Sequence, residues 1–167
     1  MLSRYRGAAR EAGADLVLRV TADCPLLDPA EADRVVATLE DDPAGADFAT
    51  NAVPRSFPRG LDAEALFRDT LERVARLATS PAAREHVTWF LYRERPELFL
   101  TRSVRDSTDN ADLRWTVDTR EDLDAVRAIY HDLGLGETVR PYREVLAHVR
   151  AHPALGERNA HVRQRDE

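Results

Sequence analysis

The chain has 167 residues, of which 43% are hydrophobic and 32% charged. This composition predicts one folded domain with a solvated surface and excludes a disordered chain. The formal net charge is −6, which argues against a general nucleic-acid binder, and all 24 basic residues are arginine. The absence of lysine excludes Schiff-base chemistry and a P-loop lysine. No apolar run has the length of a membrane span, no signal region is visible, and Cys24 is the lone cysteine. We therefore predict a cytoplasmic protein without a membrane partner.

Helix and strand patterns alternate along the first half of the chain. Residues 4–12 predict a short helix that Gly13 ends, and residues 15–20 predict a strand buried on both faces, as in a parallel sheet. After a loop over 21–29, Pro29 suits the start of a helix with apolar residues at helical spacing up to Leu39. A short strand over 47–50, a shaped loop over 51–61 rich in proline and arginine, and a short strand over 62–67 follow.

The second half continues the alternation. Helices are predicted over 71–78 and 85–93, and strands over 98–104 and 113–117 with a polar loop between them. Thr119 is the expected N-cap of a helix over 120–133, and a last helix starts near Pro141. Strands interleaved with helices predict an α/β fold with some antiparallel pairing, formed by residues 1–155 and followed by a polar tail over 156–167.

The first candidate site is the loop after the predicted strand 15–20. It presents Thr21, Asp23 and Asp28 where α/β sheets commonly bind ligands, and carboxylates there suit a divalent cation such as Mg²⁺. A purely structural role is the alternative. For Asp28, beside Pro29, we favour capping of the next helix, whereas for Asp23 the two interpretations stay open.

A second carboxylate, Asp118, lies at the junction of a predicted strand and a helix. If Thr119 caps the helix, Asp118 is free to face the same sheet edge as Asp23. Two such carboxylates within about 8 Å of each other could bind one Mg²⁺ ion and support phosphoryl or nucleotidyl transfer. Aspartate is common at such junctions, so the spacing alone is a weak signal.

Three further features carry candidate chemistry. Arg55, Arg59 and Asp62 share one loop. The guanidinium groups of the two arginines suit a carboxylate or phosphate ligand, unless they are merely solvated. His86, beside Trp89, could act as an acid, a base or a donor, although a lone helical histidine is more often structural. Cys24 has no partner motif, and we interpret it as a buried small residue rather than a nucleophile.

Taken in order, these segments resemble the spore coat polysaccharide biosynthesis protein F family, which belongs with the cytidylyltransferases that activate acidic sugars, such as the CMP-Kdo and CMP-sialate synthetases. The resemblance covers nearly the whole chain. It rests on five ordered motifs: Arg19-x-Thr21-x-Asp23-Cys24-Pro25-Leu26-x-Asp28, Asn51-x-x-Pro54-Arg55-x-x-Pro58-Arg59-Gly60-Leu61-Asp62, Arg84-Glu85-His86-Val87-Thr88, Leu113-Arg114-Trp115-Thr116-Val117-Asp118-Thr119-x-Glu121-Asp122-Leu123 and Asn159-Ala160-His161-Val162.

The resemblance implies a nucleotide-diphospho-sugar transferase fold and a Mg²⁺-dependent reaction in which an acidic sugar attacks the α-phosphate of CTP. It implies that Asp23 and Asp118 hold the metal. By the same resemblance, the substrate-binding residues on the sugar side are Arg19, Thr21, Arg55, Arg59, Asp62 and His86. No catalytic residue is assigned.

The chain departs from this family at its start. Family members open with a strand and a Gly- and Arg-rich loop ending in lysine, which cradles the triphosphate, whereas residues 1–13 here resemble a helix from well inside the family's chain. We therefore expect the N-terminal nucleotide-binding strands to be missing, the activity to be impaired, and a second copy or a partner chain to cover the exposed sheet edge. The alternative is a non-catalytic sugar-binding module or partner subunit.

Overall fold

The computed structural model describes residues 1–163 and divides the chain into two compact units, each of which is described by itself. The first unit comprises Met1–Arg19, Asp33–Val53 and Ala63–Val104. The second comprises Val20–Ala32, Pro54–Asp62 and the chain from Arg105 onward. No helix among the described residues is long and apolar enough to cross a membrane.

The first unit contains a mixed sheet of four short strands, β1 (Leu16–Arg19), β2 (Phe48–Thr50), β3 (Glu64–Phe67) and β4 (Thr101–Ser103), in the order β1-β3-β2-β4. β3 is antiparallel to both β1 and β2, and β4 is parallel to β2. The predicted α/β fold with antiparallel pairing is therefore confirmed. The prediction that the first strand is buried on both faces is wrong, because β1 lies at the edge of the sheet and Leu18 is 39% exposed.

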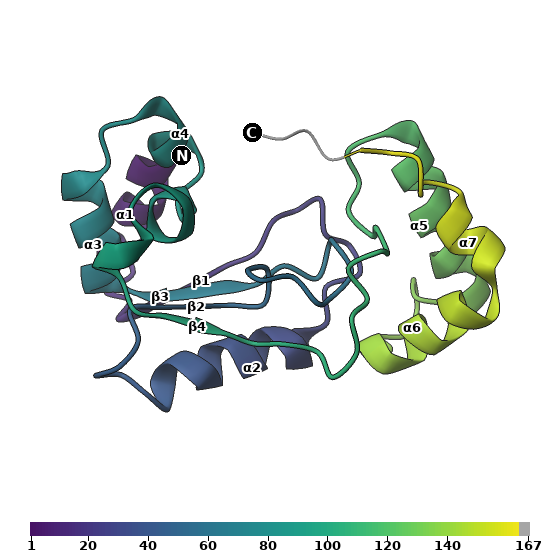
Figure 1. Cartoon of the computed structure of the whole chain (residues 1–167). Coiled ribbons are helices and arrows are strands. Elements are labelled where there is room, and N and C mark those ends of the chain that lie inside the picture. The colour runs from purple at the N-terminus through teal and green to yellow at the C-terminus, as the bar shows by residue number, and fades with distance from the viewer. Residues whose placement is uncertain (164–167) are drawn as a thin grey trace. The chain divides into compact units, whose positions relative to one another are not determined.

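Helices lie on both faces of this sheet in Figure 1, with α1 (Leu2–Glu11), α3 (Arg68–Leu77) and α4 (Pro81–Glu85) on one side and α2 (Pro29–Glu40) on the other. α1 packs against α3 and α4. The core of this unit joins these helices to the strands through twelve buried residues: Leu2, Ala9, Phe48, Leu66, Leu71, Val74, Ala78, Ala83, Val87, Phe90, Leu91 and Phe99. The continuous helix predicted over 85–93 is wrong, since α4 ends at Glu85 and a separate π-helical turn covers Phe90–Glu94.

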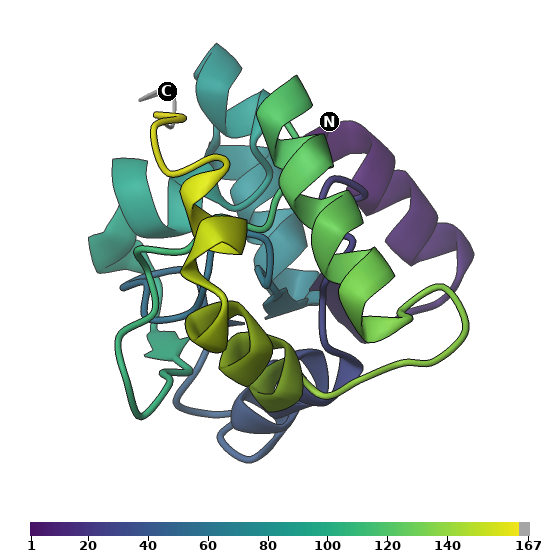
Figure 2. The same cartoon turned by 90° about the vertical axis from the view of Figure 1, so that its right-hand side faces the viewer.

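The second unit is built from three helices and long loops. α5 (Arg120–Leu133), α6 (Tyr142–Ala151) and α7 (Pro153–Glu157) pack against one another, as the green to yellow ribbons of Figure 2 show. The strand predicted over 113–117 is wrong. Its backbone groups bind loops instead, through an isolated bridge between Arg59 and Arg114 and a hydrogen bond from the Val117 N–H to Asp23 O.

Part of the predicted tail has defined structure. α7 extends into it, and the side chain of Asn159 is buried. The last residues of that predicted tail, 164–167, lie outside the described residues. The division predicted between 155 and 156 stays a prediction.

Candidate functional site

A tight turn presents Asp23 in the second unit. The Cys24 N–H donates to Thr21 O at 3.2 Å, and Thr116 Oγ1 donates to Asp23 Oδ2 at 3.2 Å. Partial burial acts to raise the pKa of Asp23, but hydrogen bonds from Thr21, its own backbone and Thr116 outweigh it and lower that pKa. Asp23 is therefore a carboxylate at neutral pH.

The loop that carries Asp118 is hydrogen-bonded to the turn of Asp23. The N–H of Val117 donates to Asp23 O at 2.8 Å, and Thr116 Oγ1 reaches the same carbonyl at 3.2 Å. The two predicted metal ligands thus come from backbone segments in direct contact, although these segments are loops and not ends of neighbouring strands. The separation of their carboxylates and their sharing of one ion stay predictions.

Thr119 caps α5 as predicted. Its Oγ1 accepts from the Asp122 N–H at 3.2 Å, and the Asp122 carboxylate accepts from the Thr119 N–H at 3.0 Å, which completes a capping box. Asp118 is therefore not the cap. Its side chain is 46% exposed, and its Oδ2 accepts from Arg114 Nη2 at 2.5 Å.

Asp28 has the structural role that we favoured. Its Oδ1 accepts from the Ala30 N–H at 2.8 Å at the start of α2, and its Oδ2 accepts from the Tyr142 N–H at 2.6 Å. Both oxygens are thus engaged by backbone donors. Cys24 is buried, and this burial raises the pKa of its thiol, which is the opposite of what a nucleophile requires.

The two arginines of the arginine loop differ in their ion pairing within residues 1–163. Arg55 donates to both oxygens of Asp62, at 2.5 and 2.7 Å. Arg59 lies partly buried nearby, and its side chain makes no hydrogen bond or ion pair with any of the residues 1–163. Burial, and next to it the positive charge of Arg55, lower the pKa of Arg59. A cation held in this way favours an incoming anion.

Gly60 fixes this loop against the loop of Asp118. It has a φ of +108°, and a Cβ on it would lie 2.5 Å from the backbone nitrogen of Thr116. The backbone of Arg59, next to this contact, makes two hydrogen bonds with the Asp118 loop. Its N–H donates to Leu113 O at 3.0 Å, and its carbonyl accepts from the Trp115 N–H at 2.6 Å. The arginine loop and the Asp118 loop therefore form one assembly.

The other two predicted substrate-binding residues belong to the first unit. Arg19, at the end of β1, is paired with the buried Glu64, whose Oε1 accepts from Thr88 Oγ1 at 2.9 Å. The Nε atom of Arg19 is buried without a hydrogen-bond partner among the described residues. His86 follows α4, with its ring 6.1 Å from that of Trp89.

The donor set of the second unit fits a magnesium ion that arrives with a nucleotide. Mg²⁺ is commonly bound by one or two carboxylates together with phosphate oxygens and waters. Asp23 and Asp118 supply two carboxylates, and no group of three or more His, Cys, Asp or Glu residues within 1–163 is arranged to hold a metal ion.

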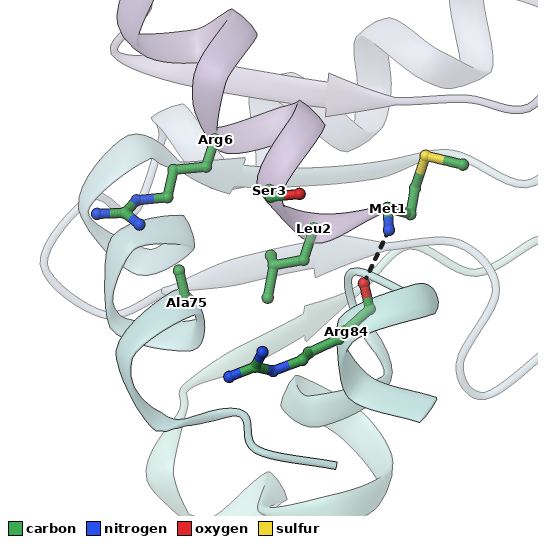
Figure 3. Close-up of a pocket in the computed structure, with 6 residues that line it drawn as sticks. All are labelled: Met1, Leu2, Ser3, Arg6, Ala75 and Arg84. Carbon is green, nitrogen blue, oxygen red and sulfur yellow. Dashed lines mark hydrogen bonds between the residues drawn. The ribbon is translucent and has the colours of Figure 1, made fainter. Parts of the chain in front are cut away.

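Two pockets lie away from these residues. One, of about 280 Å³, is in the first unit and is drawn in Figure 3, where the Met1 ammonium donates to Arg84 O at 3.1 Å; it is lined by Met1, Leu2, Ser3, Arg6, Ala75 and Arg84. The other, of about 260 Å³, is in the second unit beside α6 and α7. None of the predicted site residues lines either of these two pockets.

The chain has distant relatives among curated proteins. Spore coat polysaccharide biosynthesis protein SpsF of Bacillus subtilis (strain 168) is 25% identical over 137 residues, which cover 80% of this chain and 55% of SpsF. An uncharacterised protein of Methanocaldococcus jannaschii is 25% identical over 167 residues, which cover 99% of this chain and 65% of that protein. The chain thus spans 55–65% of the length of these relatives. A scan against protein-family models finds none that matches.

Solved structures share the fold. A cytidylyltransferase from Leptospira borgpetersenii serovar Hardjo-bovis (strain JB197) matches 99% of this chain and 67% of its own, with a TM-score of 0.85 and 24% identity. A CMP:2-keto-3-deoxy-manno-octonic acid synthetase, solved with CTP, matches 78% of this chain and 68% of its own, with a TM-score of 0.53 and 19% identity. The predicted nucleotide-diphospho-sugar transferase-like fold and the resemblance to the SpsF and cytidylyltransferase group are confirmed.

Asp122 is the residue that the sequence interpretation missed. The sequence analysis gave it no role beyond its place in one of the five motifs, yet its carboxylate is fully buried and binds Arg114 and Asn159. The capping-box pattern from Thr119 to Asp122 could have indicated that the Asp122 side chain turns back to the backbone at the start of α5. The partners Arg114 and Asn159 were not foreseeable, because they lie 8 and 37 residues away along the chain.

Proposed function

We propose that this chain is the carboxyl-terminal part of a cytidylyltransferase that prepares sugars for surface polysaccharides. In the intact protein it would transfer CMP from CTP to an acidic sugar. The observation that carries the proposal is the direct hydrogen bonding between the loops of Asp23 and Asp118, two carboxylate-bearing segments 95 positions apart, in a chain with the cytidylyltransferase fold.

In the proposed reaction, a sugar hydroxyl oxygen forms a bond to the α-phosphorus of CTP, and the bond from that phosphorus to the bridging oxygen breaks. Pyrophosphate leaves with the bonding electrons, and the hydroxyl proton goes to the solution. Asp23 and Asp118 would hold Mg²⁺, which when bound neutralises the triphosphate and the charge that develops on the leaving group. The lowered pKa of Asp23 keeps it ionised for this role.

The arginine loop would bind the acidic group of the sugar. Arg59 has a guanidinium without an ion-pair partner among residues 1–163, whereas Asp62 already neutralises Arg55. Arg55 and Asp62 therefore shape the loop, and Arg59 supplies the charge that an acidic sugar needs. Thr21 orients the turn of Asp23, while the roles of Arg19 and His86 on the sugar side stay part of the proposal.

The test is release of pyrophosphate from nucleoside triphosphates with Mg²⁺ and acidic sugars. It compares this chain with a version extended at its N-terminus by the upstream coding sequence. We expect activity in the extended version only, and a loss of at least 100-fold in its Asp23→Asn and Asp118→Asn variants. Asp124→Asn, which removes the same charge from an exposed site on α5, should retain activity. An extended, folded protein that releases no pyrophosphate would contradict the proposal.

A non-catalytic sugar-binding module or partner subunit is the second candidate. It is favoured by Arg59, whose guanidinium has no ion-pair partner among residues 1–163 and could bind an acidic sugar by itself. The two candidates differ in their genomic context. An upstream reading frame with a Gly-, Arg- and Lys-containing loop after a buried strand supports the enzyme, and its absence supports the module.

A further inference from the structure

The carboxylate of Asp122 lies at the centre of a hydrogen-bond cluster in the second unit. It is fully buried and accepts five hydrogen bonds. Its Oδ1 accepts from Arg114 Nε at 2.9 Å and from Asn159 Nδ2 at 2.8 Å. Its Oδ2 accepts from Arg114 Nη2 at 3.0 Å and from the backbone N–H groups of Asp118 and Thr119 at 3.1 and 3.0 Å.

Helix capping accounts for only one of these bonds. In a capping box the side chain at the third helical position returns to the backbone N–H of the cap, which here is Thr119. The bonds to Asp118 N and to Arg114 have another consequence. They hold Asp118 from two directions, through its own backbone and through Arg114 Nη2, which donates to Asp118 Oδ2 at 2.5 Å.

The charges in this cluster also matter. Arg114 lies between two carboxylates, of which Asp122 is buried and Asp118 is about half-exposed, and Arg59 is a second cation near Asp118. Without Asp122, the guanidinium of Arg114 would neutralise Asp118 and weaken its attraction for a metal ion. With Asp122 in place, the charge of Arg114 is shared between two carboxylates, so Asp118 is neutralised less than it would be in a pair with Arg114 alone.

Asn159 completes the arrangement from a distant part of the chain. Its Nδ2 donates to Asp122 Oδ1 and, at 2.9 Å, to the carbonyl oxygen of Arg114. This side chain is buried, and it gives a structural reason for the motif over 159–162 that the proposed function does not use.

We propose that Asp122 is a positioning residue that, with Arg114 and Asn159, orients the carboxylate of Asp118 and preserves its negative charge for a divalent cation. This inference rests on the proposed metal-binding role of Asp118. It assigns Asp122 a role in binding that goes beyond the stability of α5.

The experiment uses NMR on the full chain, with Mn²⁺ as the probe. Paramagnetic broadening of the amide signals near Asp23 and Asp118 gives the Mn²⁺ affinity, and hydrogen exchange of the Asp118 and Thr119 amides gives the order of the loop without any metal. We expect Asp122→Asn to weaken Mn²⁺ binding at least 10-fold and to speed this exchange at least 10-fold. Asn159→Ala should show smaller effects in the same direction, and Asp124→Asn should change neither quantity by more than 2-fold.

The two readouts separate this inference from the proposed function. Faster exchange with unchanged Mn²⁺ affinity in Asp122→Asn would overturn the inference, since Asp122 would then be a cap alone. Unchanged exchange would overturn it as well. If the wild-type chain binds no Mn²⁺ either alone or with CTP, the proposed metal site is rejected, and this inference, which rests on that site, is rejected with it. If Asp122→Asn does not fold, Asn159→Ala and Arg114→Lys, which keeps the charge but not the bridging geometry, must weaken Mn²⁺ binding at least 3-fold.

Discussion

Arg55 and Arg59 stand four residues apart in one loop, yet their side chains are used differently. Arg55 binds both oxygens of Asp62, and this pair leaves little charge for a ligand. The pKa of Arg59 is lowered by burial and by its proximity to Arg55, which means that its cationic form is less stable than in water. A bound anion would stabilise this cation. The two residues look alike in the sequence, and only their neighbours distinguish them.

We predict that Arg59→Gln weakens anion binding about 10-fold or more, because a hydrogen bond to a charged group contributes about 1.5–3 kcal/mol. The measurement is a titration of the full chain with inorganic phosphate, followed by NMR shifts of the loop amides. Arg120→Gln is the matched control, since Arg120 is 75% exposed and pairs with Asp124. Equal effects of the two substitutions would show that Arg59 contributes only to the general charge.

At the level of elements, the start of α5 combines a helix cap with the candidate site. Burial acts to raise the pKa of Asp122, but the hydrogen bonds from Arg114, Asn159 and the Asp118 backbone outweigh it and lower the pKa to about 2. In the unfolded chain this group titrates near its ordinary value of 3.8. The folded state therefore binds the proton less readily, so Asp122 stabilises the protein fully above about pH 4 and loses this contribution as the pH falls through about 2.

We predict that this contribution is about 2 kcal/mol, since one pKa unit corresponds to about 1.4 kcal/mol. Urea unfolding between pH 5 and pH 2.5 captures the larger part of this contribution, as a pH dependence of stability that wild type shows and Asp122→Asn lacks. The Asp124→Asn variant should follow the wild-type curve. If wild type and Asp122→Asn lose stability in parallel below pH 4, the assigned pKa of Asp122 is wrong.

Gly60 gives a second prediction for the loops. Alanine at this position would adopt a φ of +108° and place its Cβ 2.5 Å from the Thr116 backbone nitrogen. We expect Gly60→Ala to destabilise the protein by about 2–4 kcal/mol, through backbone strain and displacement of the Asp118 loop. Gly136→Ala, which meets no atom within 4 Å, is the control, and chemical denaturation measures both. A stability loss below about 1 kcal/mol for Gly60→Ala would contradict this account.

The sequence predicted those features that depend on local patterns. The helix ended by Gly13, the helix from Pro29 and the Thr119 cap follow from propensities and capping within a few residues. The prediction of a strand over 113–117 was wrong because its apolar pattern does not determine whether the backbone bonds with a neighbouring strand or with loops. In the structure it bonds with loops. The buried cluster at Asp122 was missed for a related reason, since its partners are close only after folding.

At the scale of the whole molecule, the feature to explain is the edge strand β1. β1 pairs with β3, and its other edge has no strand partner among residues 1–163. Leu18 on this strand is 39% exposed. An edge strand with an exposed apolar side chain is a template for a further strand. In the proposed enzyme, that strand would come from the additional N-terminal part.

We predict that the 167-residue chain self-associates through β1 and that Leu18→Lys weakens this association at least 5-fold, because a charged residue on an edge strand disfavours pairing. Leu77→Lys places the same charge on the exposed end of α3, where Leu77 is 49% exposed, and should leave association unchanged. Sedimentation equilibrium over a range of concentrations measures both variants. The N-terminally extended version should be monomeric if its added strand covers β1. A 167-residue chain that stays monomeric at every concentration, or that responds equally to both substitutions, would show that β1 is not the associating edge.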